Sequence, residues 1–396
     1  MKSKIFIVFL VTFSIIYLAL SSSLAIAKTY YVDNNLGNGL QSGCSDNNNN
    51  NGLTLQSPFC TIQKAANSVQ AGDTVYIRGG DYNERITISK SGTISNHIAI
   101  SGYNNENVVI DGQNSIGSPN LFLIKNTAGP VQYIDISKMI IENSVQNGMY
   151  VVDGQYITLN NLIIKDNLDV GLNLLSSSTG STHDVTIKNC YIFRNGNVPT
   201  HGDPGLKIGA QEAFNVYNIL VENCVIHDNA VGSGHDGDHG DGINPTGNSS
   251  NVHDLTFKKV VSFHNGASGI GVRMGKNILV EDSIFFDNNI NVDEQKANGN
   301  LINQTAQGEG HGIRFAFDPG QNITVLGSIS FNNFGPGITL DNMHVGVLYN
   351  NLVYGNNGNN GGNRRVGLTA QGEYLSLRNN IAYNNNISGF GKDLDL

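Results

Sequence analysis

The 396-residue chain contains no tryptophan, and only 8% of its residues are aromatic. Together with 47 glycines and many asparagines, this composition fits turns and side-chain ladders, not a helical bundle. Lys and Arg (23) are outnumbered by Asp and Glu (32), and the net charge of −9 argues against nucleic acid as a partner, because phosphate binding needs clustered cations. An acidic polymer is still compatible with the sequence, since a few local cations can outweigh the overall field. After residue 27 no apolar run is long enough to cross a membrane.

Residues 1–27 have the pattern of a secretory signal peptide. Lys2 and Lys4 form the charged start, Ile5 to Leu20 is apolar, and Ala25-Ile26-Ala27 provides a small-residue cleavage site. The alternative is an uncleaved membrane anchor, because the apolar stretch is almost long enough to span a bilayer. We expect cleavage and a secreted, extracellular protein.

Nine copies of one short pattern follow residue 139: two mostly apolar residues, a variable residue and Asn. The repeated asparagines are Asn143, Asn167, Asn195, Asn229, Asn265, Asn288, Asn333, Asn356 and Asn385. Their intervals range from 23 to 45 residues, and a basic unit near 23 residues with strand formers and Gly/Asn turns indicates a solenoid of stacked coils. Identical Asn side chains at one corner can hydrogen-bond to their copies above and below, so we assign them a structural role.

Three short strands per coil, each parallel to its copies, predict an all-β, right-handed parallel β-helix. We expect one domain over residues 28–396, with the N-terminal cap and first coils at 28–110 and regular coils with inserted loops at 130–390. A short helix between Thr61 and Val69 has Ile62, Ala65, Ala66 and Val69 on one face. Such a helix would seal the N-terminal end of the solenoid.

Four cysteines in an exported chain suggest oxidising conditions. Cys44 and Cys60 flank an Asn-rich loop and are expected to form a disulfide. Cys190 and Cys224 each lie five residues before a repeated Asn and therefore occupy equivalent places on neighbouring coils. Buried thiols are the favoured interpretation of this second pair, over a catalytic pair.

Insertions point to the functional side of the solenoid. The intervals after Asn195, Asn229, Asn288 and Asn356 exceed the basic unit by more than five residues, whereas the coil after Asn265 has no insertion. Loops on either side of a bare coil would form a cleft across one sheet, where an extended polymer can bind.

The strands that border this edge each carry Gly followed by an apolar residue. If that apolar residue points inward, alternation places the residue after it on the outer face. The outward row would contain Lys207, Asn244, Arg314 and Thr339, with Arg273 one step further along. Nearby polar residues are His201, Asp203, Asp236, Asp238, His239, Asp241 and His311.

This set of residues suits the chemistry of acidic sugars. Arg and Lys can neutralise and orient a sugar carboxylate. A neutral Lys, Arg or His could then remove the acidic proton next to that carboxylate, which begins β-elimination. The acids could instead bind Ca²⁺, which prefers oxygen ligands. The alternative is that all these groups are ordinary solvated charges on a sheet face.

With these residues in place, the chain resembles polysaccharide lyase family 9, the pectate-lyase-like right-handed β-helices. The similarity extends from Tyr30-Tyr31-Val32 to about residue 360. The family's Asp-Gly-Phe strand corresponds to Asp241-Gly242-Ile243, which implies that Asp241 is a calcium ligand. The family's catalytic Lys follows Asn-Gly-Phe, and here His311-Gly312-Ile313-Arg314 places Arg314 in the position of the base.

The coil that carries the family's Asp-Asp-Gly-Phe-Asp cluster differs in this chain and reads Ala267-Ser268-Gly269-Ile270-Gly271. Three of the expected carboxylates are therefore replaced. Either Asp236 and Asp238 rebuild the calcium site from the inserted loop, or Lys207 and Arg273 replace the charge of the metal.

The leading hypothesis is a polysaccharide lyase that cleaves a pectate-like, uronic-acid-containing polymer. Arg314 would be the base or the carboxylate clamp, and His311 or His239 would donate the proton. The substrate-binding residues would be Lys207, Arg273, Asn244, His201 and Asp203, and the metal ligands Asp241, Asp238 and Asp236. Two alternatives are a glycoside hydrolase that uses paired carboxylates and a non-catalytic glycan-binding surface protein. We expect a monomer.

Overall fold

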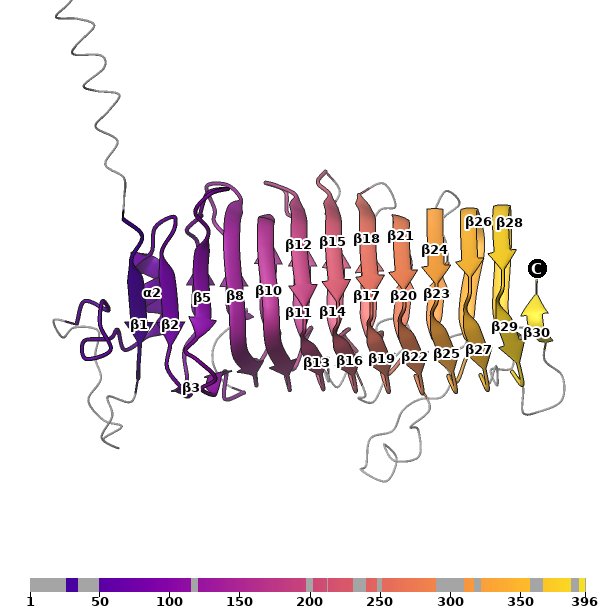
Figure 1. Cartoon of the computed structure of the whole chain (residues 1–396), viewed down its shortest axis with the longest axis horizontal. Helices are drawn as coiled ribbons and strands as arrows, with labels where there is room; N and C mark the ends of the chain where they lie inside the picture. The colour runs from indigo at the N-terminus through magenta and orange to yellow at the C-terminus, as the bar shows by residue number, and fades with distance from the viewer. Residues whose placement is uncertain are drawn as a thin grey trace, which may run out of the picture.

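The computed structural model describes residues 26–34, 50–114, 120–196, 202–211, 213–230, 240–247, 251–289, 310–316, 322–356, 366–385 and 392–395. Its strands stack in parallel along one axis, from the first coils at the N-terminal end to the last coils at the C-terminal end (Figure 1). This is the right-handed parallel β-helix that the repeated Asn turns predict.

The coils form three long sheets that enclose the core. The first sheet contains β4 (Ile86–Ile88), β7 (Asn120–Ile124), β9 (Asn147–Val152), β11 (Leu172–Leu175), β14 (Leu206–Gly209), β17 (Ile243–Thr246), β20 (Ile270–Val272), β23 (Ile313–Phe315), the first part of β26 (Ile338–Tyr349), the first part of β28 (Val366–Arg378) and β30 (Lys392–Asp395).

The second sheet follows the first around each coil. It contains β1 (Thr29–Val32), β2 (Thr74–Ile77), β5 (Ile98–Gly102), β8 (Val131–Glu142), β10 (Gly154–Lys165), β12 (Thr182–Lys188), β15 (Val216–Glu222), β18 (Val252–Lys258), β21 (Lys276–Glu281), β24 (Asn322–Leu326) and the remaining parts of β26 and β28.

The third sheet closes the coil. It contains β3 (Gly80–Tyr82), β6 (Val108–Asp111), the ends of β8 and β10, β13 (Tyr191–Phe193), β16 (Val225–His227), β19 (Val261–Phe263), β22 (Ile284–Phe286), β25 (Ile329–Phe331), β27 (Leu352–Tyr354) and β29 (Ile381–Tyr383).

The corner between the second and third sheets explains part of the asparagine content. One residue per coil has a positive φ there, for example Asn161 (55°), Asn189 (55°) and Asn223 (53°). The left-handed conformation is strained for most L-residues, but Asn tolerates it because its short polar side chain can bond locally. A single corner residue therefore turns the chain from one sheet to the next.

The repeated Asn turns form a buried ladder inside the solenoid. The Nδ2 of Asn195 donates to Oδ1 of Asn229 at 3.0 Å, and Nδ2 of Asn229 donates to Oδ1 of Asn265 at 3.0 Å. The ladder continues in the same way to Asn385. Buried amides lose their water, and these side chains recover the lost bonds from their neighbours. The structural role predicted for the repeated asparagines is confirmed from Asn167 to Asn385. The prediction is wrong for Asn143, because Ser144 takes the ladder position and its backbone N donates to Oδ1 of Asn167. Nδ2 of Asn143 instead donates to Oδ1 of Asp111 at 2.9 Å.

The N-terminal end is covered by the predicted helix. Helix α2 spans Ile62–Ser68 and packs against β1 and β4 at this end (Figure 1). Thr61 caps it by accepting a hydrogen bond from the backbone N of Lys64 at 3.2 Å. Ile62, Ala65 and Ala66 are buried, as their spacing predicts.

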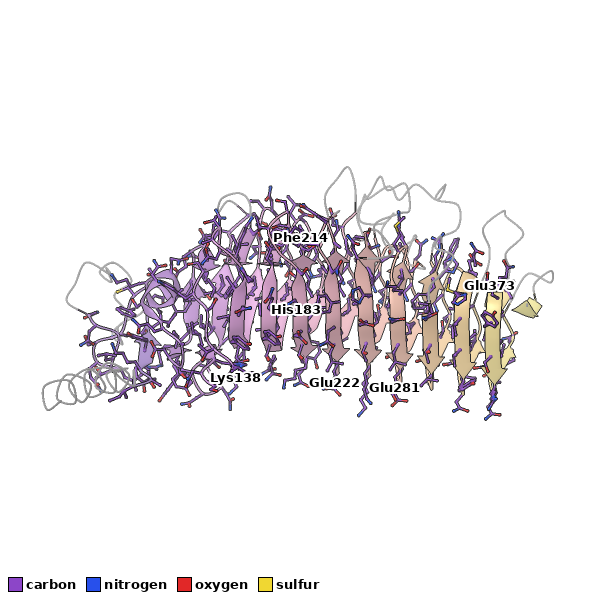
Figure 2. The ribbon with its side chains drawn as sticks, turned by 90° about the horizontal axis from the view of Figure 1, so that it is seen from above. Lys138, His183, Phe214, Glu222, Glu281 and Glu373 are labelled. Atoms are coloured by element: carbon purple, nitrogen blue, oxygen red, sulfur yellow. The ribbon has the colours of Figure 1, made fainter. Side chains whose placement is uncertain are left out.

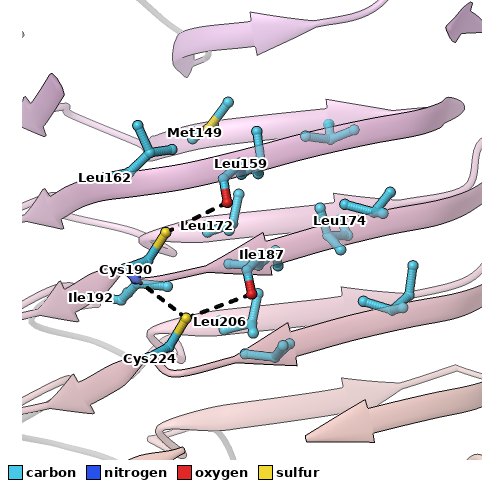
Figure 3. Packing of buried hydrophobic residues seen from close by; sticks show 14 of the residues in the cluster. Met149, Leu159, Leu162, Leu172, Leu174, Ile187, Cys190, Ile192, Leu206 and Cys224 are labelled. Atoms are coloured by element: carbon cyan, nitrogen blue, oxygen red, sulfur yellow. Dashed lines mark hydrogen bonds between the residues drawn. The ribbon is translucent and has the colours of Figure 1, made fainter. Parts of the chain in front are cut away.

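The described cysteines are in two different states. Cys190 and Cys224 are free and buried in the core, where the backbone N of Cys190 donates to Sγ of Cys224 at 3.4 Å (Figure 3). The interpretation of this pair as buried, stacked thiols is confirmed. Cys60 is disulfide-bonded, in agreement with the prediction, while Cys44 lies outside the described residues. In the described part of the chain, no helix has the length and apolarity to cross a membrane.

Candidate functional site on the first sheet

The outer face of the first sheet carries the predicted row of polar residues. Lys207 on β14 lies opposite Asn244 on β17, and Arg314 on β23 lies between Gly271 on β20 and Thr339 on β26. Gly271 follows Asn244 in the row because the preceding residues, Ile243 and Ile270, are register partners. The isoleucines before these outward residues are fully buried, so the Gly-apolar pattern fixed the orientation correctly.

Gly271 is the one position of this part of the row without a side chain, and the carboxylate of Asp241 fills the space. A Cβ on Gly271 would lie 2.3 Å from Oδ2 and 2.6 Å from Oδ1 of Asp241. Asp241 is only 2% exposed. The glycine of the bare coil therefore makes room for a buried carboxylate from the preceding coil.

Two hydrogen bonds hold the Asp241 carboxylate in this position. Oδ1 accepts from the backbone N of Ser268 at 2.9 Å, and Oδ2 accepts from Nδ2 of Asn244 at 2.7 Å. Asn244, predicted to bind substrate, is itself 4% exposed and directs its amide at Asp241. Its role in the structure is to orient the carboxylate.

Burial dominates the ionisation of Asp241. Desolvation raises the pKa of this carboxyl above its ordinary value, because water no longer stabilises the charged form. The bonds from Asn244 and Ser268 act in the opposite direction, as do the positive charges of Arg273 and Arg314. Arg273 and Arg314 are therefore near enough to Asp241 for their charges to favour its ionised form.

His311 lies next to this cluster at the start of β23. Its Nδ1 is 2.9 Å from Oγ1 of Thr339 on the following coil, and both residues are buried, at 3% and 1% exposure. The pairing fixes the orientation of the imidazole. Asp203 is also nearly buried, at 9% exposure, whereas Lys207, Arg273 and Arg314 are partly exposed.

Several predicted residues cannot be placed in this cluster. His201, Asp236, Asp238 and His239 lie outside the described residues, as do most of the predicted insertions. Conversely, Ser268 positions Asp241 and Thr339 positions His311, two roles that the sequence does not predict. The contact between Ser268 and Asp241 could have been suspected from Gly271, because a glycine interrupts the row of outward side chains at that position.

The described groups around Asp241 do not by themselves form a calcium site, and the predicted ligands Asp236 and Asp238 lie outside the described residues. Ca²⁺ takes six or more oxygen ligands, but both Asp241 oxygens accept bonds from N–H groups and the neighbouring charges are the cations Arg273 and Arg314. Among the described residues, no group of three or more His, Cys, Asp or Glu side chains could hold a metal ion.

Comparison with known proteins agrees with this architecture. Residues 43–202 match a family model described as the Pel9A-like, right-handed β-helix region. Pectate lyase PEL9 of Emericella nidulans is 41% identical over 68 residues, which is 17% of each chain. Pectate lyase L of Paenibacillus polymyxa is 25% identical over 299 residues, or 68% of this chain and 63% of that protein. The chain thus spans less than two thirds of the length of either relative.

Among solved structures, pectate lyase Pel9A superposes with a TM-score of 0.54 at 18% identity. The match covers 90% of this chain and 78% of that chain. At this level of identity the superposition shows a shared fold.

Proposed function

Because the chain is a pectate-lyase-like right-handed β-helix of the Pel9A type, we propose that it is a secreted polysaccharide lyase. Its substrate would be a pectate-like polymer that contains uronic acid, bound across the outer face of the first sheet. The similarity to pectate lyases covers only parts of their length, so the activity rests on the residues of the site.

One observation carries the proposal: Arg273 and Arg314 act electrostatically on a fixed, buried acid, and Lys207 belongs to the same outward row as Arg314. Lys207 and Arg314 belong to the same outward row and are separated by Asn244 and Gly271. Three strand spacings of about 4.8 Å place their Cα atoms about 14 Å apart. A chain of uronic acids that runs along the solenoid axis would pass both cations with its carboxylates.

In the proposed reaction, Lys207 and Arg273 bind the carboxylate of the reacting sugar and neutralise its negative charge. Arg314, in its neutral form, takes the proton from the carbon next to that carboxylate, and the electron pair forms a carbon–carbon double bond. The bond from the adjacent ring carbon to the glycosidic oxygen breaks, and His311 gives a proton to that oxygen. Asp241, held by Ser268 and Asn244, orients the guanidinium groups electrostatically.

A glycoside hydrolase is the second candidate, because one observation favours it. Burial raises the pKa of Asp241, and the general acid of a glycoside hydrolase also has a pKa above the ordinary value. A hydrolase also needs a second carboxylate, for which the nearly buried Asp203 is the described candidate.

Arg314→Ala, with Arg378→Ala as a matched control, tests the first proposal. Arg378 lies at the end of β28 in the second sheet, where its guanidinium lies over the Tyr349 ring. Both variants would be incubated with pectate, alginate and a glycosaminoglycan, and ultraviolet-absorbing unsaturated ends would be recorded beside reducing ends. We expect unsaturated ends from wild type and Arg378→Ala, and a loss of at least about a hundredfold in Arg314→Ala.

Reducing ends without unsaturation would contradict the lyase proposal and support the hydrolase. In that case Asp241→Asn and Asp203→Asn should each remove nearly all turnover. Glycan binding without any product would instead support the non-catalytic alternative.

A further inference from the structure

The outer face of the third sheet is apolar along most of the solenoid. One row of outward side chains is aliphatic apart from one tyrosine. A second row beside it consists of stacked rings from Phe193 onward, whereas its members on the two preceding coils are the charged residues Glu142 and Lys165. The first row is Ile140, Ile163, Tyr191, Val225, Val261, Ile284, Ile329, Leu352 and Ile381. The second row is Phe193, His227, Phe263, Phe286, Phe331, Tyr354 and Tyr383. We call these two rows the apolar strip.

Every residue of the apolar strip is at least partly exposed, and Tyr191, Ile381 and Tyr383 are 49–59% exposed. Contiguous apolar surface of this extent is unusual on a soluble monomer and marks an interaction site. The aromatic rings stack on one another with centroids 4.7–5.4 Å apart and planes within 12°. Since each ring face is covered by its neighbours, the strip does not offer ring faces to a sugar, and it favours the apolar surface of another protein.

Charged residues border the apolar strip on both sides. Lys188, Glu222, Lys258 and Glu281 are register partners on successive coils at the end of the second sheet. Figure 2 shows Glu222 and Glu281 projecting along one long edge of the solenoid. The other border, directly after the aromatic row, carries Arg194, Asp228, His264 and Asp287 on the corresponding coils.

In one two-fold arrangement, the charges on each border face opposite charges on the same border of a second copy. Consider a second copy that lies antiparallel on the strip, with the two-fold axis midway between Val225 and Val261. Lys188 then faces Glu281 of the second copy, and Glu222 faces its Lys258. On the other border Arg194 faces Asp287, and Asp228 faces His264. A parallel two-fold arrangement instead sets like charges at the same level, with Glu222 opposite Asp228.

We propose that the chain forms an antiparallel two-fold dimer through the apolar strip. Eight coils overlap in this arrangement, from Ile140 to Leu352, and on the first two of them the second row carries Glu142 and Lys165 in place of a ring. At about 4.8 Å per coil and about 15 Å of width they cover roughly 570 Å² per copy, or about 1,100 Å² in total. This area is at the lower end for a specific interface, so the dimer is expected to dissociate in the micromolar range. The sequence predicts a monomer, whereas we propose a dimer. This proposal does not depend on the enzymatic activity.

Sedimentation velocity of the full chain over low to high micromolar concentrations measures the dimer directly. Val261→Glu places a charge at the centre of the interface but on the surface of the monomer, so it should abolish the dimer and leave the circular dichroism spectrum unchanged. Lys188→Glu and Glu281→Lys should each weaken the dimer by at least about tenfold, because the two-fold axis repeats each like-charge contact.

The double variant Lys188→Glu/Glu281→Lys should restore the wild-type dissociation constant. Within one copy these residues are three coils apart, about 14 Å, so direct pairing between copies is what couples them. Lys276→Glu, the same change at the far border of the second sheet, is the matched control and should have no effect. A wild-type chain that stays monomeric, a dimer unaffected by Val261→Glu, or a double variant without recovery would each overturn the proposal.

Discussion

Gly271 should be indispensable to the candidate site although it has no side chain. In Gly271→Ala, the new Cβ would lie 2.3 Å from Oδ2 of Asp241, so the carboxylate must move. It would leave its bonds from Asn244 and from the backbone of Ser268, at 2.7 and 2.9 Å. Hydrogen bonds to a charged group contribute about 1.5–3 kcal/mol each, so loss of both would destabilise the fold by about 3–6 kcal/mol.

Urea unfolding followed by circular dichroism and by tyrosine fluorescence measures this cost, with agreement of the two probes as the check on cooperativity. Gly209→Ala is the matched control on the same sheet, because its Cβ would meet the flexible end of Leu175 at 3.2 Å and Thr246 at an ordinary contact distance of 3.7 Å. We expect Gly209→Ala to change the free energy of unfolding by less than about 1 kcal/mol.

A double-mutant cycle identifies the cause. Asp241→Ala removes the group that Gly271→Ala displaces, so adding Gly271→Ala to Asp241→Ala should cost little more. The coupling between the two changes should then be at least about 2 kcal/mol. Equal stability of Gly271→Ala and Gly209→Ala, or simple additivity in the cycle, would refute this account of the site.

Three further predictions concern the core and its ionisation. Asn229→Ala breaks the buried ladder to Asn195 and Asn265. It should lower the free energy of unfolding, measured by urea titration, by about 2–4 kcal/mol. A change below about 0.5 kcal/mol would show that the ladder is dispensable. Cys190 and Cys224 should react with a thiol reagent only after unfolding, because both are buried, and rapid labelling of the native protein would contradict this. The raised pKa of Asp241 means that its stabilising contribution is present below its unfolded pKa, near 4, and is lost as the pH rises through its folded pKa. Asp241→Asn should therefore gain stability relative to wild type between acid and neutral pH, and a pH-independent difference in melting temperature would count against the buried carboxylate.

The fold could be predicted because its signal is repeated. Each Asn turn recurs with the same neighbours on successive coils, so nine weak local patterns support one architecture. The outward row of Lys207, Asn244 and Arg314 followed from the alternation of side chains along a strand, which depends on nothing outside that strand.

Other features depend on contacts between coils and left no local pattern. The burial of Asp241 arises from the absence of a side chain at Gly271, 30 positions later in the sequence. The apolar strip cannot be predicted from the sequence for a similar reason. Each coil contributes only two outward residues to it, such as Val261 and Phe263, and an outward apolar residue attracts no notice until the coils are stacked in register.

The source of the oxygen in the products tests the proposed chemistry most directly. Wild-type protein would be incubated with each uronic-acid polymer in water labelled with heavy oxygen, with and without a chelator, and the new chain ends analysed by mass spectrometry. Elimination adds no water across the broken bond, so we predict unsaturated, unlabelled ends that form at the same rate with the chelator. Saturated non-reducing ends, formed together with reducing ends that carry the heavy oxygen before their hemiacetals exchange with the solvent, would contradict the lyase, because hydrolysis adds water to the anomeric carbon.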